Sequence, residues 1–282
     1  MSNAADSRTS DPLAGLADLT GVAETVESVR KAVDRIYGHR VMRRRSSEVS
    51  SEAALRGARG SAALDGADWA LEEVRRRSDF GVAGETRTVG AALRVTAETG
   101  QLLDVWRQSP LRVLARLHLV AAGGDAPDET VGRPRLAGEQ VTGPEQGPEA
   151  GLPLPGADEV SGRLDGLARL LVAGTSAPAL VTAAVVHGEL VALRPFRSHN
   201  GLVARAAERI VLVAGGLDPK SVCPAEVGHA ELGTEAYGRA LEGYAAGTPE
   251  GMAEWIRHCG RAVELGARES TAVCEALQRG AA

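Results

Sequence analysis

Hydrophobic residues recur every three or four positions along most of the chain, which is the period of an α-helix that buries one face. The first such stretch ends near Tyr37-Gly38 and carries Leu16, Leu19, Val22, Val26, Val29, Val33 and Ile36. Residues 50–77 are also helical in pattern, but Asp65-Gly66 interrupts them. Because glycine tolerates a left-handed stop and aspartate can cap the next helix, this break predicts two helices that meet at a tight corner.

Further helices are expected over residues 86–108, 110–122, 157–174, 177–192, 201–214, 225–245 and 249–277. Between them, residues 123–156 lose the helical period, and glycine and proline recur there instead. Loops of this length inside a compact domain tend to be lids, binding loops or disordered segments. The pattern therefore predicts an all-α fold interrupted by one long irregular segment.

The composition agrees with an all-α fold and limits the classes of partner that the protein is expected to bind. The 282 residues include only 3% aromatic residues, so the core is aliphatic. Lys+Arg total 32 against 37 Asp+Glu, a net charge of −5, which disfavours a nucleic-acid coat or attachment to an anionic membrane. The first twenty residues lack a basic start followed by an apolar stretch, and Pro178, His187 and Glu189 break the most apolar segment. We expect no export signal, no membrane span and a cytoplasmic location.

Cysteine and histidine spacing does not indicate a metal. Three cysteines without CxxC spacing argue against a disulfide framework or a zinc site, and we expect reduced, buried thiols at Cys223, Cys259 and Cys274. His39, His229 and His258 also form no metal-ligand spacing. We expect His187 to be a hydrogen-bonded core residue that braces the following loop, and His118 to be similar.

The stretch from His187 to Arg209, HGELVALRPFRSHNGLVARAAER, carries the candidate chemistry. A helix is expected up to Leu193, then a loop, then a second helix that opens at Asn200-Gly201. The first N–H groups of a helix lack partners within it and lie at its positive end, so they form an anion cradle. Arginines at 194, 197 and 205 can add planar guanidinium donors that suit phosphate oxygens.

These residues resemble the signature of Fic domain proteins, HPFx(D/E)GNGRxxR. The match covers Pro195-Phe196, Asn200-Gly201 and Arg205, and the family often has a histidine where His187 stands. VGRPR at 131–135 and LPLP at 152–155 are similar to the flap that precedes the family motif. The resemblance implies an all-α Fic-like domain with a short β-hairpin flap somewhere in 123–156.

A second resemblance concerns regulation. Ser61-Ala62-Ala63-Leu64-Asp65-Gly66 is similar to the inhibitory-helix pattern (S/T)xxxE(G/N) of many Fic proteins, with aspartate in place of glutamate. In the family this acid pairs with the second motif arginine, which is Arg205 here, and blocks productive placement of the γ-phosphate. The resemblance implies regulatory roles for Ser61, Asp65 and Gly66, and a direct contact between Asp65 and Arg205.

The domain organisation follows from the same patterns. We expect a flexible tail over 1–15 and an N-terminal helix with a basic turn over 16–49. The Fic-like core, including the inhibitory helix and the flap, is expected over 50–220. The remaining helices, over 221–282, are expected to pack on that core.

The departures from the motif bear on activity. Arg194 stands at the position of the catalytic histidine, and an arginine stays protonated near neutral pH, so it cannot act as a general base. Ser198 replaces the acid that holds Mg²⁺, which prefers carboxylate oxygens. Leu202 replaces the first arginine and His199 a glycine. We therefore expect no catalytic residue and no motif-held metal ion, which leaves a cradle for ATP or another nucleotide at Arg194, Asn200, Gly201 and Arg205.

Three functions stay open at this point. The first is a degenerate AMP-transferase that binds a nucleotide or phosphate, or has a regulatory role, with a protein partner possible at the flap by strand addition. The second is an active transferase in which His199 acts as a relocated base, which requires His199 to share a pocket with Arg205. The third is a structural or interaction protein without a ligand, in which internal groups consume Arg194 and Arg205.

Overall fold

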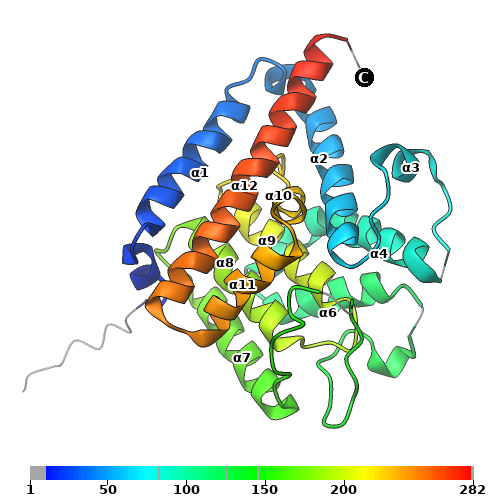
Figure 1. The fold of residues 1–282 in the computed structure, drawn as a ribbon, viewed down its shortest axis with the longest axis vertical. Helices are drawn as coiled ribbons and strands as arrows, with labels where there is room; N and C mark the ends of the chain where they lie inside the picture. Colours follow the sequence, from blue (N-terminus) through cyan, green and yellow to red (C-terminus); the bar gives the residue numbers. More distant parts are fainter. Residues whose placement is uncertain (1–10, 82, 125, 145–146, 281–282) are drawn as a thin grey trace, which may run out of the picture.

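The computed structural model describes residues 11–81, 83–124, 126–144 and 147–280, and every regular element in these residues is a helix (Figure 1). The α-helices are α1 (Val22–Tyr37), α2 (Met42–Leu64), α3 (Leu71–Arg76), α4 (Gly84–Thr99), α5 (Leu103–Trp106), α6 (Pro110–Ala122), α7 (Ala157–Ala173), α8 (Ala179–Leu193), α9 (Asn200–Ala214), α10 (Ala225–Leu232), α11 (Thr234–Ala246) and α12 (Pro249–Gln278). Short 3-10 helices occupy η1 (Ala14–Asp18), η2 (Gly100–Leu102) and η3 (Asp128–Thr130). The prediction of an all-α protein is confirmed.

Helices α8 and α9 form the centre of the fold. They pack against each other, and α8 is buried over almost its whole length, so its sequence is apolar on every side instead of on one face. Helix α12 crosses the molecule and contacts α1, α2, α8, α10 and α11, as Figure 1 shows for the red-orange helix. The loop between α8 and α9 therefore lies on a central pair of helices that pack closely against each other.

Glycine in the left-handed conformation explains one difference from the predicted helices. Residues 225–245, expected as one helix, form α10 and α11, because Gly233 has a φ of +85° that no helix can include. Gly66 has a φ of +90° and turns the chain two residues after α2, but α3 begins only at Leu71 with Ala70 at its N-cap, so Asp65 does not cap the next helix as expected. Residues 86–108 are also divided, into α4, η2 and α5.

The N-terminal tail and the β-hairpin differ from what the sequence predicts. Residues 1–10 of the expected tail lie outside the described residues, but Asp11 accepts hydrogen bonds from Thr175 and Ser176, and Leu13 is buried. The tail expected up to residue 15 therefore gives way to anchored chain by Asp11. The β-hairpin expected within 123–156 is not seen: the described residues of that segment contain η3 and irregular chain but no strand.

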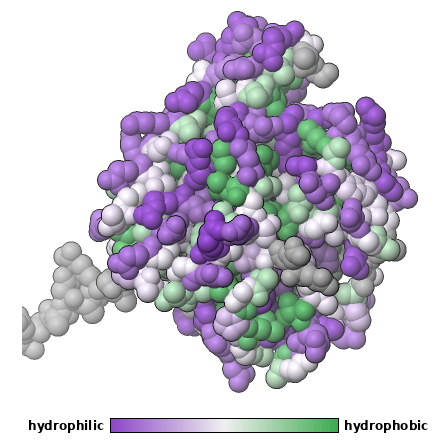
Figure 2. Space-filling model, viewed as in Figure 1, coloured by the Kyte–Doolittle hydropathy of each residue, from purple (hydrophilic) through white to green (hydrophobic). Residues whose placement is uncertain are grey.

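The surface agrees with the low net charge. The face in Figure 2 is mostly hydrophilic, and its apolar residues occur in small scattered groups. Within the described residues, no helix combines the length and apolar character needed to cross a bilayer.

Candidate functional site

The loop between α8 and α9 has a fixed shape. Arg194 and His199, at its two ends, both have left-handed backbone conformations, with φ of 45° and 58°. The buried side chain of Asn200, the first residue of α9, accepts a hydrogen bond from the Phe196 N–H at 2.9 Å and donates one to the Phe196 carbonyl at 2.8 Å. The motif asparagine therefore serves to brace the loop.

The irregular segment before α7 lies along this loop. Arg135 donates its backbone N–H to the Pro195 carbonyl at 2.8 Å and its Nε–H to the Arg194 carbonyl at 3.0 Å. Thr142 donates its backbone N–H to the Arg197 carbonyl at 2.7 Å. These isolated pairs hold the segment in the position expected of the flap without forming a strand pair, and prolines and glycines between them interrupt any longer ladder.

Arg194 does not face an open pocket. Its Nη2 donates to the carbonyls of Leu152, at 3.1 Å, and Pro153. Burial lowers the pKa of Arg194 from its ordinary value, with an opposing effect from Glu149, yet a guanidinium remains charged at neutral pH. The residue at the position of the family's base therefore tethers the segment before α7.

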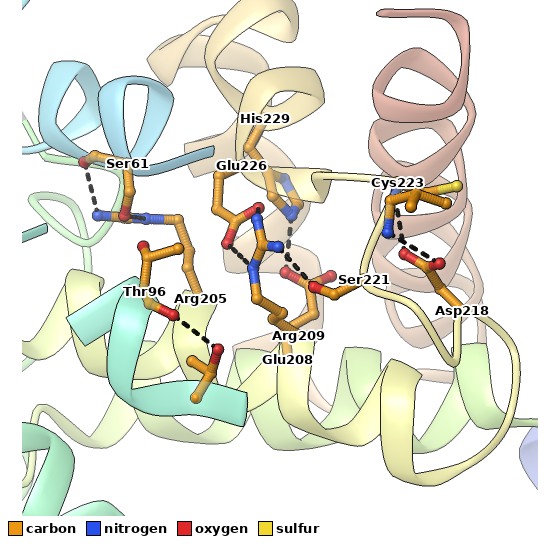
Figure 3. Close-up of polar contacts among 12 residues, drawn as sticks. Ser61, Thr96, Arg205, Glu208, Arg209, Asp218, Ser221, Cys223, Glu226 and His229 are labelled. Carbon is orange, nitrogen blue, oxygen red and sulfur yellow. Dashed lines mark hydrogen bonds and ion pairs between the residues drawn. The ribbon is translucent and has the colours of Figure 1, made fainter. Parts of the chain in front are cut away.

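Arg205 is fully enclosed and is held by the end of α2. Its Nε–H donates to Ser61 Oγ at 2.7 Å, and its Nη2 donates to the Ser61 carbonyl at 3.0 Å and to Asp65 Oδ1 at 2.5 Å (Figure 3 shows the pair Ser61 and Arg205). The expected contact between Asp65 and Arg205 is confirmed. A Cβ at Gly201 would lie 2.7 Å from Asp65 Oδ1 and 2.9 Å from Arg205 Nη1, so a larger residue there would displace one of these side chains.

A second carboxyl group, which sequence reasoning missed, adjoins the same residues. Glu149 is half-buried; burial raises its pKa, the Asp65 charge raises it further, and Arg205 and Arg194 oppose this. Its Oε2 atom is buried without a hydrogen-bond partner among the described residues. Asp65 and Glu149 thus bring two acidic groups to the place where the sequence predicts an anion.

A cavity of about 180 Å³ opens on the other side of the motif loop, lined by residues that include Gln140, Thr142, Arg197, Ser198 and His199. The Ser198 hydroxyl and His199 Nδ1 are 2.8 Å apart, and Arg205 does not line this cavity. The His199 side chain and the Arg205 side chain therefore do not share it.

His118 forms part of the wall of this cavity. Its ring stacks on Phe196 with centroids 4.3 Å apart, and its Nδ1 accepts the Gly132 N–H at 3.0 Å. Burial, with a smaller effect of His199, lowers the pKa of His118 to about 4. His118 is therefore the neutral core histidine that the sequence predicts.

The motif does not fit the Mg²⁺ ion that the resemblance implies for a working transferase. The position of the metal-binding acid holds Ser198, whose hydroxyl is engaged with His199, and the nearby Asp65 carboxylate is engaged with Arg205. Hard dications need several oxygen ligands, of which carboxylates contribute most.

Other polar residues of α9 are structural. Arg209 forms a two-pronged ion pair with Glu226, with both N–H···O distances at 2.8 Å, and donates to Ser221 (Figure 3). His187 is fully buried as expected, but its ring contacts Glu208 and Tyr237 and not the motif loop. Arg209 and His187 therefore belong to the core.

Sequence spacing also missed a buried cluster beneath the motif. His187, Glu208, His229 and Cys259 come from α8, α9, α10 and α12, and their nearest N, O and S atoms all lie within 4.8 Å of one another. These residues are 21, 21 and 30 positions apart along the chain, so no short motif could reveal them. We call this group the His–Glu–His–Cys cluster.

Comparisons with known proteins agree with the resemblance seen in the motif. No family model matches the sequence, and no curated protein matches it. Among solved structures, a Fic family protein from Desulfovibrio desulfuricans is 19% identical, with a TM-score of 0.67 over 88% of this chain and 74% of its own. Fic-1 from C. elegans is 16% identical, with a TM-score of 0.60 over 89% of this chain and 71% of its own.

A Fic domain containing signaling protein from Bacteroides thetaiotaomicron is 11% identical, with a TM-score of 0.60 over 89% of this chain and 98% of its own. The similarity thus extends well beyond residues 50–220, to which the motifs pointed. The shared course of the chain, together with the placement of the motif loop between α8 and α9, establishes that this protein has the Fic-domain fold.

Proposed function

We propose that this is a Fic-type protein with a degenerate nucleotidyltransferase site, which binds a nucleotide or phosphate ligand in a regulatory role and does not transfer AMP efficiently. The observation that carries the proposal is Arg194. A permanently charged guanidinium stands where a proton acceptor is required, and it is tied to the carbonyls of Leu152 and Pro153. Loss of a general base alone removes about 10²–10⁴ in rate.

The remaining cradle gives the ligand class. Gly201 and the first turn of α9 provide backbone N–H groups at the positive end of a helix, and Arg205 lies against Gly201. Arg205 is fully buried; its Nη1 makes no well-aligned hydrogen bond among the described residues, although the Tyr237 hydroxyl interacts with the same guanidinium. A phosphate group of ATP or a related nucleotide would satisfy this donor.

The acidic side chains beside Arg205 give a mechanism by which ligand binding in the cradle is regulated. Asp65 accepts from Arg205, and Glu149 lies close enough to Asp65 and Arg205 for their charges to change its pKa. An entering phosphate must compete with Asp65 for the same guanidinium. We propose that the end of α2 acts as an inhibitory element by this competition.

The two other functions are less well supported. A relocated base at His199 needs a pocket shared with Arg205, and the cavity that His199 lines does not include Arg205. A structural or interaction protein, with a partner at the flap segment, is favoured by the internal bonds of Arg194 and Arg205. Measurement of ATP binding distinguishes a structural or interaction protein from a ligand-binding one.

The test is nucleotide binding by Asp65→Ala, measured by calorimetry with ATP and with a non-hydrolysable analogue. Because Asp65 no longer competes, we expect the Kd to fall by roughly tenfold or more, which corresponds to about 1.4 kcal/mol. Asp68→Ala is the matched control, because this neighbouring carboxylate is exposed and pairs with Arg59. It removes the same charge and should leave the Kd unchanged.

Equal tightening in both variants would mean a general charge effect and would contradict an inhibitory role for Asp65. Absence of saturable binding in the native chain and in Asp65→Ala would overturn the ligand-binding proposal and favour the structural reading.

A further inference from the structure

The His–Glu–His–Cys cluster has the composition and position of a metal site. Its four side chains come from four different helices, and all four are completely buried, with no exposed surface. Figure 3 shows Glu208 and His229 facing each other between α9 and α10. Imidazole nitrogen, thiolate sulfur and carboxylate oxygen are the ligands that Zn²⁺ takes in proteins.

The spacing of the ligand atoms is close to that of a tetrahedral centre. Glu208 Oε2 lies 2.9 Å from His187 Nδ1 and 3.1 Å from His229 Nε2. Ligand atoms bound to one tetrahedral zinc are about 3.3–3.8 Å apart, given metal–ligand bonds of about 2.0–2.3 Å. The two distances to Glu208 Oε2 are shorter than this, and the four ligand atoms all lie within 4.8 Å of one another, so side-chain shifts would adjust the spacing to admit the ion.

The second nitrogen of each imidazole already has a partner. His187 Nε2 contacts the Tyr237 hydroxyl, and His229 Nδ1 lies 3.2 Å from His258 Nε2. Metal-binding histidines almost always engage their other ring nitrogen in this way, which fixes the tautomer and the direction of the free lone pair. The rings of His187 and His229 are thus held with Nδ1 and Nε2, respectively, toward Glu208.

The protein alone leaves the cluster incompletely satisfied. Glu208 Oε1 is buried and makes no hydrogen bond with the described residues, although Glu208 Oε2 lies within hydrogen-bond distance of His187 Nδ1. Burying a carboxyl group with one oxygen unpartnered is costly without a compensating cation.

A dication removes this cost. A metal ion deprotonates the thiol that coordinates it, so Cys259 would bind as a thiolate. One Zn²⁺, one carboxylate and one thiolate sum to zero charge, and two neutral imidazoles complete four ligands. Four protein ligands without solvent access are typical of structural zinc sites, because catalytic sites keep one position open.

We propose that the His–Glu–His–Cys cluster binds one Zn²⁺ ion, which ties α10 and α12 to the α8–α9 pair that carries the motif loop. The ion is acquired during folding, since the ligands are fully enclosed afterwards. This site is separate from the proposed nucleotide cradle and does not depend on it. The absence of CxxC spacing does not argue against it, because its ligands are gathered by tertiary packing.

The test is the metal content and ligand shell of the full chain, produced with zinc in the medium and purified without chelators or immobilised metal. We expect about one zinc per chain after exhaustive dialysis, with an X-ray absorption spectrum of one sulfur and three nitrogen or oxygen neighbours. The spectrum is taken on the native chain, so it does not depend on whether a variant folds.

Cys259→Ser should lower the retained zinc by roughly tenfold or more, in line with the loss of a direct ligand. Cys274→Ser is the matched control, because Cys274 is also buried on α12 and lies outside the cluster, so it should leave the zinc content unchanged. A native chain that retains no zinc, or one whose zinc has no sulfur neighbour, would overturn the proposal.

Discussion

At the scale of single residues, two positions of the motif carry the proposal of a degenerate site. Arg194 stands where the Fic signature has histidine, and Ser198 stands where it has an acid. Arg194 donates to the carbonyls of Leu152 and Pro153, so this arginine holds the segment before α7. Restoring a histidine at 194 alone would therefore also release the segment that lies over the motif.

His118 provides a residue-scale prediction about pH. Its pKa is about 4 in the folded protein, against an ordinary value near 6.5. Above pH 6.5 it is neutral in both states and has no effect; as pH falls from 6.5 to 4, the unfolded chain binds a proton that the folded chain does not. The free energy of unfolding should therefore fall over this window, by about 3 kcal/mol from this residue.

The measurement is urea unfolding between pH 7 and 4 for the native chain and for His118→Asn. The asparagine can still accept the Gly132 N–H but does not titrate. The stability of the variant should depend less steeply on pH in this window. An identical slope in the two proteins would show that His118 does not carry this dependence.

Contacts between single residues could be predicted from the sequence where both residues belong to a motif. The contact between Asp65 and Arg205 was predictable because both residues lie in patterns with a known spatial relation. Glu149 was not, because it lies in a glycine- and proline-rich segment without a period, and only the fold brings it near Arg194 and Arg205. Polar contacts made by irregular chain leave no local signal.

At the scale of elements, helix boundaries were predictable where a stop is chemically explicit. Pro110 at the start of α6 and Gly66 after α2 mark their helices to within a residue or two. Gly233 was overlooked because an isolated glycine within a helical pattern is ambiguous until its φ is known. The expected flap hairpin is absent from the described residues, where the amides of Arg135 and Thr142 bond to the motif loop and others form local turns.

The close packing of α10 against α12 gives an element-scale prediction. A Cβ at Gly228 would lie 2.0 Å from the Ala262 carbonyl oxygen, which is backbone and cannot turn away. Gly228→Ala should therefore lower the free energy of unfolding by about 1–3 kcal/mol or more. Thermal and urea unfolding of the variant measure this loss.

Gly162→Ala is the control for that substitution. Gly162 lies within α7, and an added Cβ meets nothing within 4 Å. Because alanine is the better helix former, this change should stabilise the protein by about 0.5–1 kcal/mol. If both substitutions had the same effect, the close approach of α10 and α12 would be refuted.

At the scale of the whole molecule, the chain shares the Fic-domain fold but departs from the Fic signature at several motif positions. Structural similarity to Fic proteins covers 88–89% of the chain at 11–19% identity, so the fold persists although most residues differ. The aliphatic period predicts the helices, whereas their arrangement was expected from the motif resemblance. The His–Glu–His–Cys cluster shows the limit of such reasoning, because four helices must assemble before its members meet.

The central claim is that this Fic-fold protein does not transfer AMP efficiently, because its motif lacks a base and a metal ligand. The most direct measurement is incubation of the full chain and of Asp65→Ala with α-labelled ATP, in Mg²⁺ and in Mn²⁺, followed by detection of labelled protein. We predict no label above that of Arg205→Ala in either sample. Label that increases in Asp65→Ala and disappears when His199 is also changed to alanine would contradict the account.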